Sequence, residues 1–334
     1  MDSLTIRRPD DWHLHLRDGD MLARVAPDSA AFGRAVVMPN LVPPVATGAQ
    51  AAAYRERVVA AGFARPLMTL YLTEDTDPAD VARAHAEGVV FAVKLYPAGA
   101  TTNSASGVRD FEKVRPVLAA MEEAGVPLLM HGEVTDPQID IFDREAAFLD
   151  RRLEPIRRAH PALKLTLEHV TTEDAVAYVT AHGLGATITP QHLLCDRSDL
   201  LVGGLPPHFY CLPILKRRRH REALIEAATT RTEFFLGTDS APHPRHSKEA
   251  ACCAAGCYSA PHALPLYAMA FEEAGRLDAL EAFASLNGPR HYGLAPNADT
   301  VTLRRGDPLD LSTPETDPVV VPFDPGRAVH WRLA

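Results

Sequence analysis

The sequence of 334 residues predicts an α/β protein, a (β/α)8 TIM barrel in a single domain. Two observations lead to this fold class. Short runs rich in Val, Leu, Ile and Phe alternate along the chain with longer stretches rich in Ala, Glu and Arg. That alternation is typical of parallel strands joined by helices, and eight apolar runs are enough to close a barrel. A doubly wound open sheet is the alternative, but no G-x-G-x-x-G motif follows the first strand.

The predicted strands are short and are bounded by Gly, Pro or Asp. In chain order they are residues 4–7 leading to His13 and His15, then 34–38, 66–72, 89–96, 126–131, 163–169, 184–189 and 234–239. The helices predicted between them are residues 48–61, 78–87, 111–124, 143–158, 172–181 and 221–229. Thr172-Glu173-Asp174 is typical of a helix start, since acidic residues are favoured in the first turn.

Two connections are longer than usual. Residues 98–108 (AGATTNSASGV) are small and polar, which predicts a mobile lid. Residues 191–216 contain GGLPPHFYCLP, whose prolines and aromatics predict an ordered excursion. From roughly 291 to 334 the chain is rich in Pro and Asp, and we expect a C-terminal extension that wraps the barrel. No change of composition marks a second domain within 1–334.

Charge and cysteine content narrow the function classes. Lys and Arg number 34 against 43 Asp and Glu, a net charge of −9, which argues against binding to nucleic acid or a membrane surface. No long apolar segment is present, so we expect a cytoplasmic protein. The cysteine count is odd, which favours reduced thiols, and the group Cys252, Cys253 and Cys257 lacks a second pair for a structural zinc site.

Residues able to bind a metal lie at the ends of the predicted strands. They are His13 and His15 on the first strand, Lys94 on the fourth, His131 on the fifth, His169 on the sixth and Asp239 on the eighth. The carboxyl ends of barrel strands meet at one rim, where active sites are built. We therefore expect these six side chains at one mouth. The other helical or peripheral histidines are expected to be structural or solvated: His85, His160, His182, His220, His291 and His330.

His13 and His15 are two residues apart, so both side chains of an extended strand face one side. Imidazole and carboxylate together suit zinc. Lys94 differs, because an ammonium has no lone pair to donate. Burial and nearby positive charge lower a lysine pKa. The neutral amine can then add carbon dioxide and become a carbamate, an anionic ligand able to bridge two metals. Ordinary buried histidines and a structural lysine are the alternatives.

Several motifs together resemble one family. They are DWHLHLRD at 11–18, VMPN at 37–40, KLYPA at 94–98 with TTNS at 101–104, HGE at 131–133, LEH at 167–169, HFYCLP at 208–213 and GTDSAPH at 237–243. In this order they resemble the amidohydrolase superfamily and, more closely, the short, bacterial-type (class II) dihydroorotases. The resemblance covers roughly residues 5–290.

That resemblance implies a hydrolase of cyclic amides that interconverts N-carbamoyl-L-aspartate and L-dihydroorotate in de novo pyrimidine (UMP) biosynthesis. Two Zn²⁺ ions are implied. His13, His15 and Asp239 would bind the first and His131 and His169 the second. Carbamylated Lys94 (N6-carboxylysine) and a hydroxide would bridge them, and Asp239 would also be the general acid and base.

The resemblance further implies a small-molecule binding site and a homodimer. Arg17, Asn40 and His243 would bind the substrate carboxylate, and main-chain groups of Leu212, Ala255 and Gly256 would contact the ring or ureido group. Thr101 and Thr102 would be the tips of the lid. Read from the residues alone, Arg17 could instead pair with its neighbour Asp18, and Asn40 could be a turn residue.

Two other functions stay open at this point. Another cyclic-amide hydrolase, such as a hydantoinase or dihydropyrimidinase, is one, although such relatives usually carry a β-rich domain before the barrel. A metal-free scaffold or partner subunit on the same barrel is the other, because a fold does not determine function.

Overall fold

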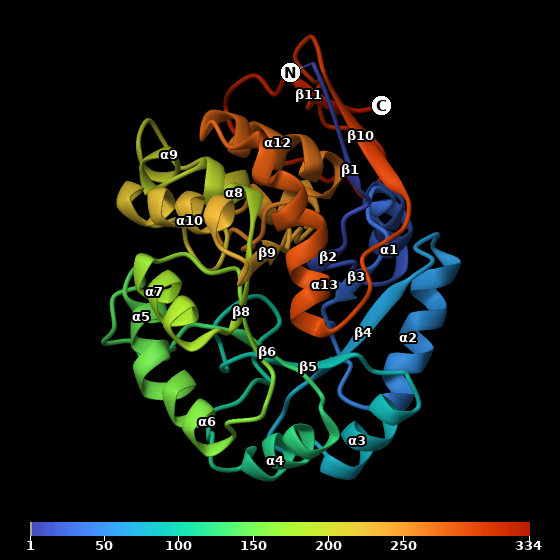
Figure 1. Ribbon diagram of the computed structural model, residues 1–334, viewed down its shortest axis with the longest axis vertical. Coiled ribbons are helices and arrows are strands. Elements are labelled where there is room, and N and C mark those ends of the chain that lie inside the picture. The colour runs from blue at the N-terminus through green and yellow to red at the C-terminus, as the bar shows by residue number, and fades with distance from the viewer. Residues whose placement is uncertain (1) are drawn as a thin grey trace.

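A closed ring of eight parallel strands forms the centre of the computed structural model, which describes residues 2–334 (Figure 1). In order around the ring they are β2 (Asp11–Leu14), β3 (Ala35–Val37), β4 (Pro66–Tyr71), β5 (Ala92–Leu95), β6 (Leu128–His131), β7 (Leu165–Glu168), β8 (Gly185–Ile188) and β9 (Phe234–Leu236). The backbone just beyond β9 closes the ring, because Asp239 N donates to His13 O at 2.9 Å and His15 N donates to Ser240 O at 3.1 Å. The predicted barrel is confirmed.

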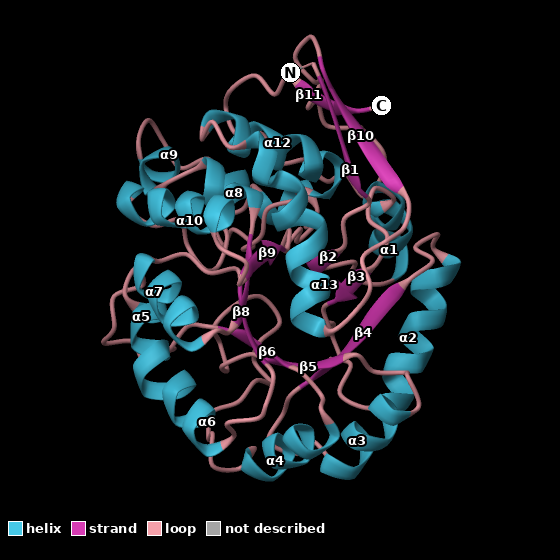
Figure 2. Ribbon diagram, viewed as in Figure 1, coloured by secondary structure: helices cyan, strands magenta, loops and turns pink. Residues whose placement is uncertain are grey.

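Helices surround the strands on the outside (Figure 2). They are α1 (Gly19–Val25), α2 (Gly48–Ala60), α3 (Pro78–Ala86), α4 (Arg115–Ala124), α5 (Arg144–Phe148), α6 (Glu154–Ala159), α7 (Glu173–His182), α8 (Pro190–Leu194), α9 (Arg197–Leu201), α10 (Arg218–Thr230), α11 (Arg245–Lys248), α12 (Ala263–Glu273) and α13 (Asn287–Tyr292). Within residues 2–334, none of them has the length and apolar character needed to cross a bilayer.

Local signals explain some of the helix boundaries. Thr172 caps α7 by accepting a hydrogen bond from Ala175 N, as its sequence predicts. The helix predicted over 111–124 begins only at Arg115, because the residues before it form turns. The helix predicted over 143–158 is interrupted by a π-helical turn at Leu149–Leu153. The long connection 191–216 is ordered, as predicted, and includes α8 and α9.

The prediction for the first strand is wrong in part. Residues 4–7 lie in β1 (Ser3–Arg7), which pairs antiparallel with β10 (Thr300–Arg305), and β10 pairs with β11 (Trp331–Leu333). Only Ile6 of β1 is buried, the pattern of a strand with one wet face, whereas every residue of β2 is buried. The barrel therefore starts only after Pro9, which lies between β1 and β2. Strands β10 and β11, after residue 299, form a separate three-stranded sheet with β1.

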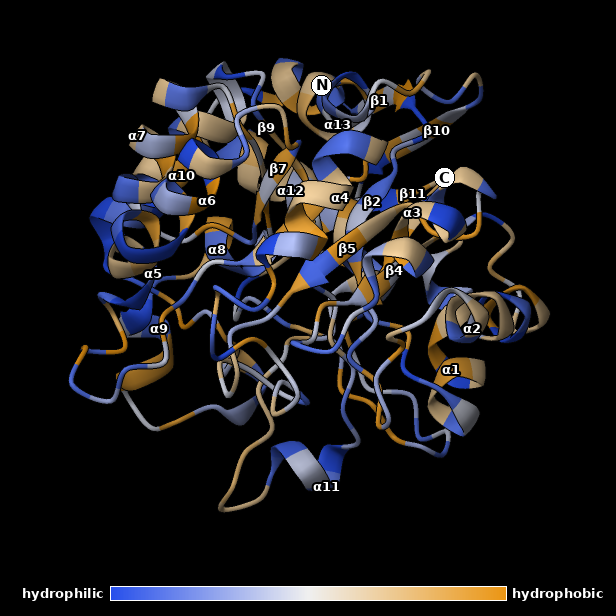
Figure 3. Cartoon of the chain, turned by 90° about the horizontal axis from the view of Figure 1, so that it is seen from below, coloured by the Kyte–Doolittle hydropathy of each residue, from blue (hydrophilic) through white to orange (hydrophobic). Residues whose placement is uncertain are grey.

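The interior of the barrel changes character along its axis. Side chains two residues apart on a strand share a face, so Ala92 and Lys94 both point inward, as do Leu129 and His131. Ala92 and Leu129 belong to an apolar cluster with Trp12, Val36, Met38, Phe235 and Tyr292. Lys94 and His131 lie beyond this cluster, toward the carboxyl ends of the strands. In the side view of Figure 3 the loops that carry α9 and α11 extend away from the strands at one end.

Candidate metal centre and active site

Three of the predicted ligands are in direct contact at the junction of β2 and β9. His13 Nε2 lies 3.2 Å from His15 Nε2, and Asp239 Oδ1 lies 3.3 Å from His13 Nε2 and 3.0 Å from His15 Nε2. The register between β2 and β3 shifts between Asp11 and Leu14, which indicates a bulge that re-aims side chains. His13 therefore reaches the mouth although its neighbour Trp12 packs in the apolar interior.

The other three come from β5, β6 and the end of β7, which are neighbouring strands on the other side of the ring. The ring centroids of His131 and His169 are 4.7 Å apart, and those of His13 and His169 are 5.0 Å apart. Lys94 pairs through Nζ with Glu168 Oε2, which also lies 3.1 Å from His13 Nδ1. All six predicted residues are buried. The structure thus brings them together at the carboxyl end of the barrel.

Buried polar groups beneath the cluster hold its backbone. The Asp11 carboxylate accepts hydrogen bonds from His13 N at 3.0 Å, Thr238 N at 2.9 Å and Thr238 Oγ1 at 2.6 Å. Thr187 Oγ1 accepts from His169 N at 2.7 Å. These contacts join neighbouring strands directly below the ligands, which limits their freedom to move.

Strained backbone is concentrated at this mouth. Among residues 2–334, the non-glycine residues with positive φ are Arg17 (60°), Asn103 (56°), His169 (43°) and Asp239 (44°). Left-handed conformations cost such residues free energy and persist where surrounding structure enforces them, which is common at functional sites. Two of the four are predicted metal ligands, one is a predicted substrate residue and one lies in the lid.

Burial and neighbouring charge shift the protonation equilibria of the cluster. Burial lowers the pKa of Lys94 despite the opposing effect of Glu168, and burial also lowers the pKa of His169. Burial raises the pKa of Asp239, but His13 and His15 more than compensate and hold that pKa well below its usual value. The lowered lysine pKa favours the neutral amine that carbamylation requires.

The donor set fits metal binding. One ligand atom each from His13, His169 and Asp239 lies within 4.8 Å of the other two. His169 Nδ1 and Glu168 Oε1 are buried without a hydrogen-bond partner. Buried polar atoms normally have partners, and buried charges are normally paired or bound to metals. Imidazole nitrogens with carboxylate oxygens are the donors that zinc prefers.

The predicted carboxylate-binding residues Arg17 and His243 lie beside this cluster. The Arg17 guanidinium donates to Pro242 O at 3.1 Å and lies 3.2 Å from His243 Nε2 and 3.4 Å from His15 Nδ1. Burial, with the charge of Arg17, lowers the pKa of His243 to about 3, so this imidazole is neutral. Nε2 of His243 also lies 3.0 Å from Ala255 O.

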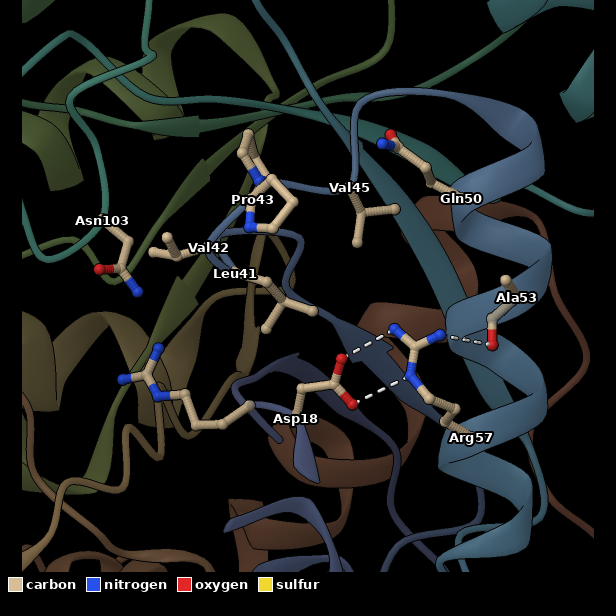
Figure 4. A pocket seen from close by; sticks show the side chains of 11 residues that line it. Asp18, Leu41, Val42, Pro43, Val45, Gln50, Ala53, Arg57 and Asn103 are labelled. Atoms are coloured by element: carbon tan, nitrogen blue, oxygen red, sulfur yellow. Dashed lines mark hydrogen bonds and ion pairs between the residues drawn. The ribbon is translucent and has the colours of Figure 1, made fainter. Parts of the chain in front are cut away.

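Arg17 does not pair with Asp18. Figure 4 shows the Asp18 carboxylate held by two nitrogens of Arg57, at 3.0 and 2.8 Å, at one side of a pocket of about 320 Å³. Arg17 and Asn103 line the same pocket. Within the described residues the hydrogen bonds of Arg17 reach a carbonyl and imidazoles, not a carboxylate. A partly buried guanidinium without a carboxylate partner is suited to bind an anion from solution.

The predicted lid lies against the mouth. Thr102 Oγ1 donates to Ala255 O at 3.2 Å, Asn40 Nδ2 donates to Thr102 O at 3.1 Å, and Asn103 Nδ2 donates to Asn40 O at 3.1 Å. Thr101 is held inside the loop, because its N–H donates to Ser104 Oγ at 2.9 Å. Thr102, and not Thr101, is therefore the lid residue that contacts the opposite side, and the Asn40 amide is engaged by the lid.

The three predicted main-chain contacts come from two adjacent segments. Gly256 N donates to Tyr210 O at 3.0 Å, which places Leu212 and its neighbours next to Ala255 and Gly256. A Cβ on Gly256 would lie 2.7 Å from Ala241 O, so only glycine fits this close approach. Leu212 itself is half-buried.

Sequence reasoning missed several residues that support this arrangement. Glu168 and Glu133 were part of recognised motifs but had no assigned role, yet each contacts a ligand histidine: Glu133 Oε2 lies 2.8 Å from His131 Nε2. A carboxylate next to or two residues from such a histidine is the signal that could have found them. Asp11, the first residue of the DWHLHLRD motif, and Lys248 are also buried and bonded to the backbone, and no local pattern marks Lys248.

Comparison with known proteins bears directly on this site. The chain matches the amidohydrolase family model over residues 10–305. It is 66% identical over 342 residues to a dihydroorotase of Ruegeria pomeroyi and 59% identical over 338 residues to one of Cupriavidus taiwanensis, covering 99% and 98% of both chains respectively. The chain belongs to the amidohydrolase family and, within it, to the dihydroorotases.

Solved structures agree with that membership. The dihydroorotase of Campylobacter jejuni superposes with a TM-score of 0.90 at 37% identity, covering 99% of this chain and 97% of that one. The Saccharomyces cerevisiae dihydroorotase, solved with 5-fluoroorotic acid, gives 0.92 at 30% identity, covering 100% and 99%. An L-hydantoinase from Arthrobacter aurescens gives 0.79 at 15% identity and covers 99% and 83%, which shows a shared amidohydrolase fold alone.

Proposed function

We propose that this amidohydrolase is a zinc-dependent dihydroorotase that interconverts N-carbamoyl-L-aspartate and L-dihydroorotate in pyrimidine biosynthesis. The observation that carries the proposal is the buried cluster of His13, His15 and Asp239 next to Arg17, a guanidinium without a carboxylate partner among the described residues. The first group suits a hydrolytic metal centre, and the second suits an acidic substrate.

The proposal assigns two zinc ions to the six buried residues. His13, His15 and Asp239 would hold one ion, His131 and His169 the other, and carbamylated Lys94 both. When bound, such ions lower the pKa of water and polarise a carbonyl group, so that amide hydrolysis proceeds at neutral pH. Glu133 and Glu168 would orient the imidazoles of His131 and His13, which they contact at 2.8 and 3.1 Å.

Asp239 would transfer the proton. Its Oδ1 is at the centre of the cluster, and its backbone is tied to His13 O at 2.9 Å. In the hydrolytic direction the carboxylate accepts the proton of the attacking water and returns it to the leaving ring nitrogen. In the condensing direction the same carboxylate moves the proton the opposite way, and water is lost.

The remaining residues would bind and enclose the substrate. Arg17, Asn40 and His243 would hold its carboxylate, and main-chain groups of Leu212, Ala255 and Gly256 its ring or ureido group. Lid closure through Thr102 removes bulk water, which favours condensation. One N–H of the Asn40 amide donates to Thr102 O in the structure, so the second N–H would bind the carboxylate.

Metal analysis and an activity assay on the purified protein test the proposal together. We expect about two equivalents of zinc per chain and reversible hydrolysis of dihydroorotate, both lost on chelation and restored by zinc with bicarbonate. Carbon-13 NMR after incubation with labelled bicarbonate should give a carbamate signal that is absent from Lys94→Ala. Zinc-free protein without dihydroorotate hydrolysis after reconstitution would contradict the proposal.

A matched substrate pair separates this function from that of a hydantoinase. Dihydrouracil has the same cyclic amide but lacks the carboxylate. We expect strong preference for dihydroorotate, because its carboxylate would pair with the partly buried Arg17, whereas dihydrouracil would leave that guanidinium without an anion. Equal turnover of the two would indicate a dihydropyrimidinase-type enzyme. A cytoplasmic homodimer is also part of the proposal, and light scattering measures the oligomeric state.

A further inference from the structure

Lys248 is a buried cation whose donors all reach main-chain carbonyls. It is the last residue of α11, and 3% of its surface is exposed. Its Nζ donates to Tyr210 O, Ala254 O and Gly256 O, each at 2.8 Å. An ammonium group has three N–H donors, so its hydrogen-bonding capacity is filled by these carbonyls. Burial lowers the pKa of Lys248.

The three carbonyls belong to the two segments that border the mouth. Tyr210 lies two residues before Leu212, and Ala254 and Gly256 lie on either side of Ala255. Gly256 N donates back to Tyr210 O at 3.0 Å, so one carbonyl oxygen accepts from both the lysine and the other segment. Lys248 therefore ties together two loops that are about 45 residues apart in the sequence.

Successive carbonyls in this segment point in opposite directions. The oxygens of Ala254 and Gly256 face Lys248, whereas the oxygen between them, on Ala255, lies 3.0 Å from His243 Nε2 and accepts from Thr102 Oγ1 at 3.2 Å. Holding the two outer carbonyls on one side leaves the central one directed at the mouth. The side chain of Lys248 thus determines the direction of a group that it does not contact.

We propose that Lys248 is a positioning residue that aims the Ala255 carbonyl into the mouth, where it accepts a hydrogen bond from an N–H of the substrate amide and then from the lid. The inference rests on the proposed function. A carbonyl fixed in direction recognises N–H donors, and a cyclic amide or ureido substrate carries such a group. Positioning by a side chain that lies behind the loop leaves the mouth itself free for the substrate.

The test replaces Lys248 with methionine, which keeps the length of the side chain and removes all three donors. We expect KM for dihydroorotate to rise about 10-fold or more, because a recognition hydrogen bond is lost along with its geometry. We expect kcat to change less than about 3-fold and zinc content to stay at the wild-type value, because the hydrogen bonds of Lys248 reach none of the six predicted metal ligands.

Asn287→Leu is the matched control. Asn287 is also buried and donates from Nδ2 to two carbonyls, Phe234 O at 3.0 Å and Arg231 O at 3.3 Å, but at the amino end of β9. Its loss should lower thermal stability and leave KM unchanged. If Lys248→Met does not fold, Lys248→Gln retains a shorter side chain with donors, and a smaller rise in KM, about 3-fold, is expected.

A double-mutant cycle with Thr102→Val separates positioning from a general structural role. Thr102→Val alone should raise KM, because the lid loses its bond to Ala255 O. In the Lys248→Met background, Thr102→Val should have almost no further effect on KM, since the Ala255 carbonyl is no longer held in the direction of the lid. Additive effects of the two changes, or a wild-type KM in Lys248→Met, would overturn the inference. Absence of dihydroorotate hydrolysis in the wild-type protein would instead overturn the proposed function.

Discussion

The two ends of the barrel are built from the same strands, but the amino end buries apolar side chains and the carboxyl end buries polar and charged ones. At the amino end Trp12 stacks on Tyr292 with ring centroids 4.6 Å apart and meets Phe235 edge-on at 6.2 Å, in an apolar cluster. At the carboxyl end imidazoles, carboxylates and a lysine are buried with several atoms unpartnered. One end satisfies packing, whereas the other accumulates unfavourable burial and backbone strain.

A separation of two residues along a strand divides these roles. Ala92 and Lys94, Leu129 and His131, and Thr166 and Glu168 are such pairs on neighbouring strands. Aromatic and aliphatic burial stabilises the fold by roughly 25 cal/mol per Å² of apolar surface, which offsets the cost of the polar end. We therefore expect that substitutions at one end of the barrel change stability and substitutions at the other change catalysis.

Asp239→Asn should abolish most activity without unfolding the protein. The amide cannot accept the proton, and it is a poorer metal ligand, so kcat for dihydroorotate should fall by about 1,000-fold or more. Steady-state kinetics and zinc content measure the effect, and circular dichroism checks the fold. Activity within tenfold of the wild type would contradict the assigned role.

Arg17→Met should act on binding more than on the chemical step. We expect KM for dihydroorotate to rise about 100-fold, because a charge-assisted contact to the carboxylate is lost. Stability should be retained, since Arg17 pairs with imidazole and carbonyl groups rather than a carboxylate of the described chain. Arg57→Met, which breaks the Asp18 ion pair at the rim of the neighbouring pocket, is the control and should change KM less than threefold.

Gly288→Ala tests the opposite end. A Cβ at this position would lie 2.0 Å from Trp12 Nε1, so the aromatic cluster must shift. Overpacking of this kind costs about 1–3 kcal/mol, which lowers Tm by several degrees in a protein of this size. KM should remain at the wild-type value. A large change in KM with little change in Tm would contradict the independence of the two ends, because it would mean that a change at the amino end alters the active site.

His291→Gln should give the smallest effect, visible only as a change with pH. Burial lowers the pKa of His291 to about 3, while Nε2 lies 3.0 Å from Thr166 Oγ1. Below pH 6.5 His291 binds a proton in the unfolded chain but stays neutral in the folded protein. The free energy of unfolding that depends on His291 therefore falls as pH falls from 6.5 toward 3. The loss in unfolding free energy between pH 7 and 5 should therefore be about 1–2 kcal/mol smaller in the variant, measured by urea denaturation. An identical pH dependence would show that His291 is not desolvated.

The sequence predicts the barrel and the position of the polar mouth for a definite physical reason. Alternating strands and helices lead to parallel closure, and parallel closure brings strand ends together, so His131 and Asp239 could be placed near one another without any knowledge of contacts. The same reasoning predicts that residues 98–108 form a lid, because a long connection of small polar residues is typical of one, and its closure over a substrate stays a prediction.

What the sequence could not show depends on contacts between distant segments. Residues 4–7 have strand composition, but composition does not reveal that their partner is β10 rather than the barrel. Lys248 follows no motif, because its role comes from carbonyls of other residues. Glu168 was visible beside His169, but its pairing with Lys94 joins β7 to β5 across the intervening strand β6, inside the barrel. In each case a local pattern leaves the partner undetermined.

The three-stranded sheet places the two ends of the chain side by side. Arg305 N donates to Asp2 O at 2.9 Å, and Ala334 N donates to Thr302 O at 2.9 Å, and Figure 1 shows the N and C labels close together beside β1, β10 and β11. During synthesis β1 must therefore remain without its partner until β10 (Thr300–Arg305) has left the ribosome. For the same reason a short linker could join residues 2 and 334, and new ends could be opened in a distant loop while the order of strands around the barrel is preserved.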